Sequence, residues 1–263
     1  MTIATGGLSN PFHFEEWVYP AYRNTIGKVA SDPRPRSGER TFVAVLAGQS
    51  NISNWGVTKY TPAHQSKIDN VSFVDGGCYQ GNDPALGASG ADGSWLFRFA
   101  DKLITAGTFD RVILVPNAVG GSTIEHWQPS SILGHHLPVS FRRCAELGLT
   151  VDAVLWQQGE SNHGTTGADY QALFASMIAP IRDAGYNAPW FLGKSTWVPG
   201  GVTAAGVRAA CDALVNGVDI FAGADTDTLG ASYRQSSGTS PHFTDAGSDA
   251  AAGLWASAIQ AVF

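Results

Sequence analysis

The chain has 263 residues, of which 44% are hydrophobic and 14% charged, and its formal net charge is −6 at pH 7. A chain of this length and hydrophobicity can bury a substantial core, which fits one large α/β domain better than two small ones. With only 16 Lys and Arg residues, no basic run and no stretch of roughly 18 consecutive apolar residues, nucleic acid and membrane are excluded as expected partners.

Residues 1–40 contain four prolines and show neither a helical nor a strand period. We therefore expect an irregular N-terminal arm, followed by a single domain over residues 41–263. The arm is a candidate for contacts with a larger assembly or a second copy, and the sequence leaves the oligomeric state open. The amino terminus lacks the charged-then-apolar pattern of a signal peptide, so the sequence does not define a cellular location.

Apolar segments alternate with amphipathic segments after residue 40. We expect strands at residues 42–47, 71–74, 111–116, 151–156, 189–193 and 218–222. We expect helices at residues 94–106, 139–147, 168–184, 203–215 and 244–262. Such alternation implies βαβ units with right-handed crossovers. The predicted fold is a three-layer α/β/α sandwich with a mainly parallel, flavodoxin-like sheet of about five strands.

The first strand ends at a small polar turn, Gly48-Gln49-Ser50-Asn51. Many hydrolases present a nucleophilic serine on a glycine-containing turn after a buried strand. In open parallel sheets, ligands bind at the carboxyl ends of the strands, where Ser50 is expected. Serine is also a common turn residue, so this segment alone does not establish catalysis.

Three later segments also place polar residues after predicted strands. Gly120 and Gly121 follow the strand at 111–116, and a glycine pair lets backbone N–H groups approach an anionic oxygen. Residues 156–162 place two glutamines and a glutamate after the next strand, where buried polar groups need partners. His242 precedes the last helix, and histidine is the side chain that shuttles protons near neutral pH.

The chain has three cysteines without CxxC spacing, Cys78, Cys144 and Cys211. They suggest neither a disulfide framework nor a zinc site, so we expect buried free thiols. Four residues of metal-ligating types lie in one segment, Glu125, His126, His135 and His136. Because their spacing is neither helical nor a Cys/His ligand pattern, we expect surface histidines, no metal and no cofactor.

Taken in order, these segments resemble the SGNH hydrolase superfamily, most closely its branch of sialate O-acetylesterases and acetylxylan esterases of carbohydrate esterase family 6. The resemblance spans about residues 40–263. It rests on a GQSN-like block at 48–51, a Gly-Gly-Ser…Trp block at 118–127 and a WxQGES-like block at 156–161. Each block alone is a weak signal, whereas the ordered set is specific.

The resemblance implies a nucleophile, a base and an oxyanion hole. Ser50 would be the nucleophile and His242 the general base. The oxyanion hole would combine the Ser50 amide, an amide at Gly120 or Gly121, and the Gln158 side chain. The reaction implied is two-step transfer of an acyl group through an acyl-enzyme.

The acid that orients the histidine departs from the family pattern. Many relatives have an aspartate three residues before the histidine, where this chain has Thr239. Glu160 is the first choice for the acid because it shares the loop of Gln158. Asp225 and Asp227 are the second choice, and a Ser-His dyad assisted by a backbone carbonyl is the third.

The resemblance also implies that the substrate is an O-acetylated oligo- or polysaccharide, which favours action outside the cell. Asn51, Trp55, Trp127 and Trp197 are candidate substrate contacts, since indole faces can stack on sugar rings, although each tryptophan could equally be a core residue. A general short-chain carboxylesterase and a catalytically impaired carbohydrate-binding module are the alternative functions.

Overall fold

The computed structural model describes residues 24–34 and 36–263. Most of the predicted arm, residues 1–23 together with residue 35, lies outside the described residues. The described part of the arm forms no helix and one isolated bridge, between Ala30 and Tyr79. The buried Arg111 guanidinium donates to the backbone carbonyls of Asp32 and Arg34, which attaches this part of the arm to the start of a central strand.

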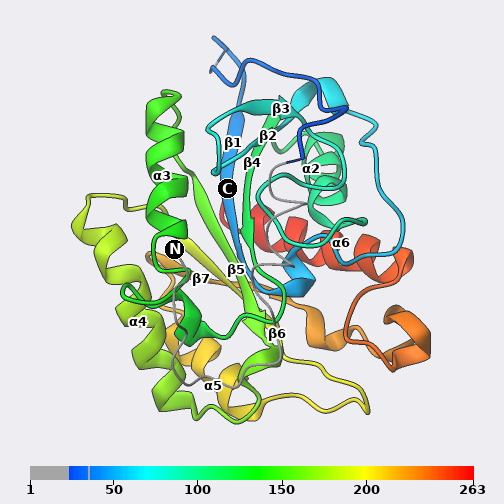
Figure 1. The fold of residues 1–263 in the computed structure, drawn as a ribbon, viewed down its shortest axis with the longest axis vertical. Helices are drawn as coiled ribbons and strands as arrows, with labels where there is room; N and C mark the ends of the chain where they lie inside the picture. The colour runs from blue at the N-terminus through cyan, green and yellow to red at the C-terminus, as the bar shows by residue number, and fades with distance from the viewer. Residues whose placement is uncertain (1–23, 35) are drawn as a thin grey trace, which may run out of the picture.

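One sheet of seven strands runs through the described part of the chain, in the order β3-β2-β4-β1-β5-β6-β7 (Figure 1). The strands are β1 (Thr41–Gly48), β2 (Ile68–Val71), β3 (Cys78–Gln80), β4 (Arg111–Ala118), β5 (Ala153–Gly159), β6 (Trp190–Ser195) and β7 (Ile220–Asp225). All neighbours pair in parallel except β2 and β3. The predicted mainly parallel sheet is confirmed, with seven strands in place of about five.

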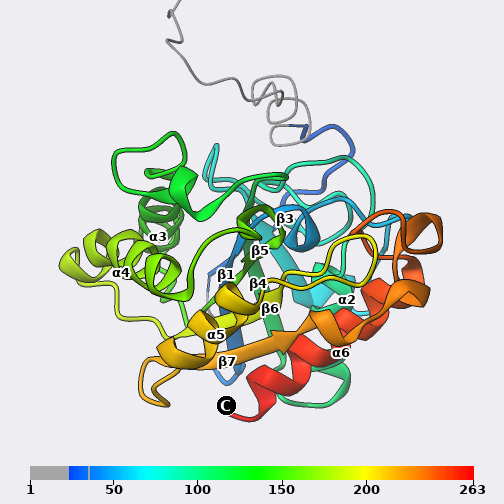
Figure 2. The same ribbon diagram turned by 90° about the horizontal axis from the view of Figure 1, so that it is seen from below.

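Helices cover both faces of this sheet (Figure 2). They are α2 (Leu96–Thr105), α3 (His136–Glu146), α4 (Gly167–Asp183), α5 (Ala205–Leu214) and α6 (Asp245–Gln260). Buried side chains of α3, α4 and α5 pack on one face, and those of α2 and α6 pack on the other. The predicted three-layer sandwich is therefore confirmed. No helix in the described ranges has the length and apolar character needed to cross a membrane.

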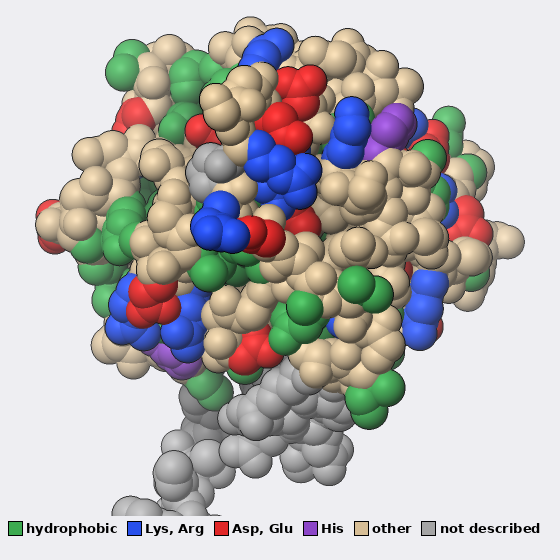
Figure 3. All heavy atoms as spheres, turned by 90° about the horizontal axis from the view of Figure 1, so that it is seen from above, with side chains coloured by type: hydrophobic (Ala, Val, Ile, Leu, Met, Phe, Trp, Pro, Cys, Tyr) green, Lys and Arg blue, Asp and Glu red, His purple; other side chains and the backbone are tan. Residues whose placement is uncertain are grey.

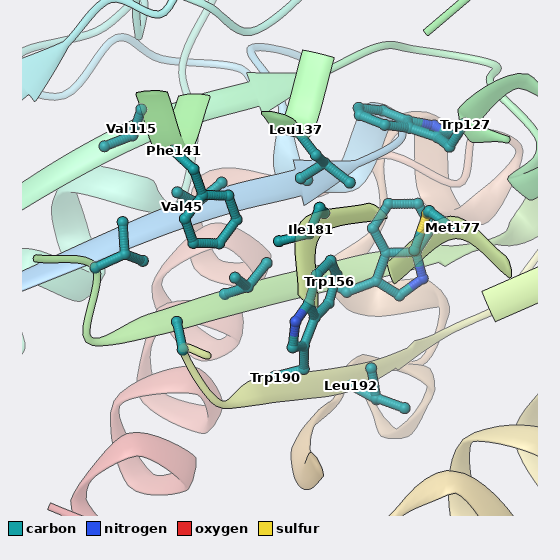
Figure 4. Close-up of a cluster of buried hydrophobic side chains, with 14 of the residues drawn as sticks. Val45, Val115, Trp127, Leu137, Phe141, Trp156, Met177, Ile181, Trp190 and Leu192 are labelled. Carbon is teal, nitrogen blue, oxygen red and sulfur yellow. The ribbon is translucent and has the colours of Figure 1, made fainter. Parts of the chain in front are cut away.

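Side chains along β1 point alternately to the two faces of the sheet, so this strand contributes to both hydrophobic cores. Val43 and Val45 point into the core beneath α3, α4 and α5, whereas Phe42 and Leu46 point into the core beneath α2 and α6. Aromatic residues fill much of the first core, with Trp127, Trp156 and Trp190 in one cluster (Figure 4). Because both faces are covered, the central strands are apolar through their middle, and their polar residues lie toward the strand ends.

Most observed elements begin and end within a few residues of the predicted ones, but the strand expected at 71–74 shares only Val71 with β2, so that prediction is largely wrong. Two further differences are informative. Helix α3 begins at His136, before Pro138, because proline is tolerated in the first turn, where backbone N–H groups have no partner within the helix. Strand β3 has three residues in a glycine-rich segment, too few to show a period of two.

The parallel strands β1, β4, β5, β6 and β7 end at the same edge of the sheet, and short turns follow several of them there. In sheets of this kind the edge at the carboxyl ends is where binding sites form. On the opposite side of the molecule, acidic and basic side chains lie intermixed, without a continuous basic patch on the face shown (Figure 3).

Candidate active site

Ser50 lies where the sequence predicts it, at the carboxyl end of the central strand β1. It opens a 3-10 turn, η1 (Ser50–Ile52), and its side chain is 6% exposed. Gly48 has φ +138°, and a Cβ atom there would lie 2.0 Å from the Gln157 carbonyl oxygen. The sharp approach to Ser50 therefore requires glycine. Backbone N–H groups at the start of such a turn have no partner within it, so the Ser50 amide is available as a donor.

Asn51 joins the three segments that carry the predicted nucleophile, acid and base. Its Nδ2 donates to Glu160 Oε1 at 2.5 Å and to the Pro241 carbonyl oxygen at 3.1 Å. Glu160 opens the turn after β5, and Pro241 immediately precedes His242. Asn51 is 3% exposed and its amide nitrogen bonds within the protein, so its side chain holds these segments together.

Glu160 has one carboxylate oxygen in hydrogen bonds and one without a partner. Oε1 accepts from Asn51 and from Ser195 Oγ at 2.7 Å. Oε2 is buried and makes no hydrogen bond with any residue in the described ranges. Burial raises the pKa of Glu160 to about 7, opposed by these hydrogen bonds and by the positive charge of Arg234. Glu160 thus has a free oxygen with which to accept a proton-bearing group.

The other two acids considered from the sequence already have partners. Asp225 accepts two hydrogen bonds from Arg208 at 2.8 Å each. Asp227 accepts from Arg208 and from the backbone N–H groups of Thr196 and Trp197. Both carboxylates therefore secure the ends of β6 and β7 and have little capacity left for a histidine.

His242 lies on the loop that precedes α6, which the Arg234–Phe243 bridge and a hydrogen bond from the Gln235 N–H to the His242 carbonyl hold closed. Its ring stacks on Trp55 with centroids 5.2 Å apart, and neither ring nitrogen bonds to a residue that the structure describes. Burial, with help from Arg234, lowers the pKa of His242 to about 4. The imidazole is therefore neutral at neutral pH, as a general base must be.

The structure distinguishes the two glycines proposed for the oxyanion hole. The Gly120 N–H donates to Ser89 Oγ at 2.7 Å and is already used. The Gly121 N–H makes no hydrogen bond within the described ranges, and this residue has φ +72°, a conformation that favours glycine. Gly121 is thus the better candidate for a backbone donor.

Gln158 is placed differently from the expectation. Its side chain is fully buried, and Nε2 lies within hydrogen-bond distance of three acceptors, Gln49 Oε1, the Ser122 carbonyl and Asn162 Oδ1. An amide nitrogen has two hydrogens, so none is left for an oxyanion. Gln49 Oε1 also accepts from the backbone of Gly159 and Ser161. Gln158 therefore belongs to the framework that fixes the residue before Ser50.

Of the three tryptophans predicted to meet substrate, only Trp55 is partly exposed. Trp127 is 1% exposed in the core of Figure 4, and Trp197 is 4% exposed beneath the Arg234 guanidinium. Neither side chain has an exposed face in this structure on which a sugar ring could stack. The two residues fit the alternative considered from the sequence, that of core tryptophans.

Of the histidines considered from the sequence, His135 is at the surface as expected, whereas His136 is buried. His136 is 8% exposed and its Nδ1 bonds to Asn117 Oδ1 at 2.9 Å, so it is not the surface histidine that was expected. Glu125 Oε2 accepts from Asn162 Nδ2 at 3.0 Å. Within the described ranges, no three His, Cys, Asp or Glu side chains converge as metal ligands would. The three cysteines are buried and free, as expected.

Sequence reasoning missed two residues of this site. Ser195, at the end of β6, donates to Glu160, and Arg234 donates to the Pro241 carbonyl at 2.7 Å. A polar residue at a strand end was a readable signal for Ser195. No sequence pattern pointed to Arg234, because its partners are backbone carbonyls of other loop residues that only the fold brings close.

Several solved structures share this fold. They include a protein from Arabidopsis thaliana (20% identity, 86% of this chain and 99% of that one, TM-score 0.67), a novel carbohydrate acetylesterase from Xanthomonas citri (18%, 84% and 56%, 0.56) and NanS (16%, 87% and 98%, 0.55). At these identities the likeness shows the fold, an α/β/α sandwich. No curated protein sequence matched the chain.

The family described as carbohydrate esterase, sialic acid-specific acetylesterase, matches residues 40–196, more than half of the chain. The chain therefore belongs to this family of acetylesterases. The matched range includes Ser50, Gly121 and Glu160, whereas His242 lies beyond it.

Proposed function

We propose that the protein is a serine esterase of the SGNH type that removes O-acetyl groups from carbohydrates, with Ser50 as nucleophile and His242 as general base. The observation that carries the proposal is the Asn51 side chain, which bonds at once to Glu160 and to the residue before His242. Asn51 follows Ser50 directly, so one residue joins the three segments. Family membership supports the class of reaction.

The mechanism proposed is a two-step acyl transfer. His242 accepts the Ser50 proton as the hydroxyl attacks the ester carbonyl, and the Ser50 and Gly121 amides donate to the oxyanion. Water then attacks the acyl-enzyme with the same base. Gln158 contributes indirectly, by holding Gln49 against the turn after β5.

Glu160 is proposed as the acid that steadies the imidazolium form of His242. Its free oxygen Oε2, and its link to Pro241 through Asn51, support this choice over a dyad without an acid. An acid in this position fixes the tautomer of the histidine and stabilises its positive charge.

Replacing Glu160 with glutamine tests this assignment. We expect the Glu160→Gln variant to lose on the order of 10³- to 10⁴-fold in kcat, the scale seen when a triad loses its acid. Asp225→Asn and Asp227→Asn are matched controls that remove a nearby carboxylate bonded to Arg208, and they should stay within about tenfold of wild type. Esterase assays on the three variants measure these losses. A larger loss of kcat in either control than in Glu160→Gln would overturn the assignment.

The pH dependence of kcat/KM gives a second test of the acid. Both His242, with a pKa of about 4, and Glu160, with a pKa of about 7, must be unprotonated for turnover. The group with the higher pKa, Glu160, sets the pH below which kcat/KM declines, which we call the acid limb of the pH profile. Activity should therefore fall as the pH drops through about 7. In Glu160→Gln the limb should move down toward pH 4. A limb near pH 4 in both proteins would show that Glu160 does not take part.

The space beside Ser50 supports a small acyl group. A cavity of about 10 Å³ adjoins Ser50 and is lined in part by Trp55, Trp95 and Phe243. That is about the volume of one water, so this conformation has no room for a long acyl chain beside Ser50, and we expect acetyl to be preferred. Acetate release should be measured from O-acetylated sugars and polysaccharides, with acetyl and butyryl esters of a simple alcohol alongside. Equal turnover of acetyl and butyryl esters, without activity on carbohydrate, would indicate a general short-chain carboxylesterase.

A further inference from the structure

Arg234 is a buried cation without a carboxylate partner. Its side chain is 1% exposed, and its guanidinium donates to three backbone carbonyls, those of Leu229, Thr226 and Pro241, at 3.1, 2.7 and 2.7 Å. The group also lies over the Phe243 ring, 4.2 Å from its centroid. No carboxylate in the described ranges comes within ion-pair distance of it.

Such an arrangement is costly for stability alone. A buried charge loses its hydration, and apolar residues of similar volume commonly do as well or better in its place. What arginine adds is a rigid fork of donors that can bind several carbonyls at once while stacking on aromatic rings. The contacts that need this fork are therefore the ones to consider.

Two of those contacts hold the neighbours of His242 on both sides. The Pro241 carbonyl, just before His242, accepts from Arg234 and from Asn51. Phe243, just after it, lies under the guanidinium and pairs with the Arg234 backbone. The short segment 241–243 is thereby fixed from the Ser50 turn on one side and from Arg234 on the other.

Thr239, at the position where relatives carry the acid, does not help to fix segment 241–243. Thr239 is exposed, and its hydroxyl donates to the Ser236 carbonyl within the same loop. Nothing at position 239 therefore reaches from the loop tip to the base. Arg234 is the charged side chain of the His242 loop that is turned inward.

We propose that Arg234 is a positioning residue for the general base, which fixes segment 241–243 against the Ser50 turn and supplies the positive charge under which His242 works. This inference rests on the proposed esterase function.

The charges around His242 give the proposal a measurable signature. Arg234 lowers the pKa of His242 and opposes the burial that raises the pKa of Glu160. Asp227 also faces Arg234 electrostatically, but it is paired with Arg208. Loss of the cation should therefore raise the pKa of both groups that must be unprotonated.

The test compares Arg234→Gln and Arg234→Lys with Arg111→Gln. Arg111 is a control of equal burial, because it is also 1% exposed and bonded to backbone carbonyls. It differs in being paired with Asp69, and it lies at the start of β4, away from the edge of the sheet that carries Ser50. All three variants should be folded by circular dichroism, with lower Tm values for the two glutamine variants.

We expect Arg234→Gln to lose about 10- to 100-fold in kcat, the scale of a misplaced catalytic group, and to move the acid limb of kcat/KM up by about 1 pH unit. Arg234→Lys should lose kcat but keep the limb, because it retains the charge. Arg111→Gln should keep both. A wild-type limb in Arg234→Gln, or the same shift in Arg111→Gln, would overturn the proposal.

Failure of this inference is distinguishable from failure of the proposed function. If Ser50→Ala abolishes activity while Arg234→Gln keeps the wild-type kcat and limb, only the role of Arg234 falls. If Arg234→Gln does not fold, Arg234→Lys decides alone, and wild-type kcat in that variant would contradict the positioning role.

Discussion

Replacing Ser50 with alanine is expected to reduce kcat for ester hydrolysis on the order of 10⁶-fold, the scale seen when a serine hydrolase loses its nucleophile. Ser50 lies at the end of β1, where Gly48 allows a sharp turn that most residues could not adopt. Alanine removes only the hydroxyl oxygen, so the turn and the backbone donors remain. Acetate release under saturating substrate is the measurement.

The matched control for this variant is Ser140→Ala. Ser140 is also buried, on α3, where its hydroxyl donates to the His136 carbonyl at 3.1 Å. Ser140 also accepts from the buried Asn117 Nδ2 at 2.8 Å, so its loss should cost about 1–3 kcal/mol of stability and leave turnover close to wild type. Turnover of Ser50→Ala at the level of Ser140→Ala would remove Ser50 from the mechanism.

Replacing His242 with alanine is expected to cost nearly as much as the loss of Ser50, because nucleophile and base act as a unit. The low pKa of His242 keeps its imidazole ready to accept a proton at neutral pH. Added imidazole should restore part of the activity in His242→Ala, since the stacking face of Trp55 then lies open. Activity should be measured with and without imidazole.

A histidine outside the site serves as the control. His64 lies at the surface beside Asp101, to which its Nδ1 bonds at 2.9 Å. The His64→Ala variant should hydrolyse ester like the wild type and show no response to imidazole. Equal losses in both variants, or full activity in His242→Ala, would contradict the role of His242.

The fold could be predicted because its central strands are buried on both faces. Residues 42–47 and 112–116 form continuous apolar runs, which lie in β1 and β4. The edge strand β3 has three residues, and its pairing with β2 depends on a glycine-rich loop without a period. The pattern of apolar residues predicts a strand where the strand is buried, and does not predict a short strand at the edge of the sheet.

The candidate site was predictable where one motif carries the chemistry, and not where distant segments meet. Ser50, Glu160 and His242 could be named from their blocks. The bond between Asn51 and the Pro241 carbonyl spans 190 positions, so the bridge that joins these blocks appears only in the fold. Residue type likewise could not show that Trp197 is covered by Arg234.

Covalent labelling tests the central claim most directly, namely that Ser50 is a nucleophile activated by His242. The folded chain is treated with a fluorophosphonate and analysed by peptide mass spectrometry. We predict one adduct, on Ser50, which forms far more slowly in His242→Ala. No adduct on Ser50, or an adduct that forms equally fast without His242, would contradict the account.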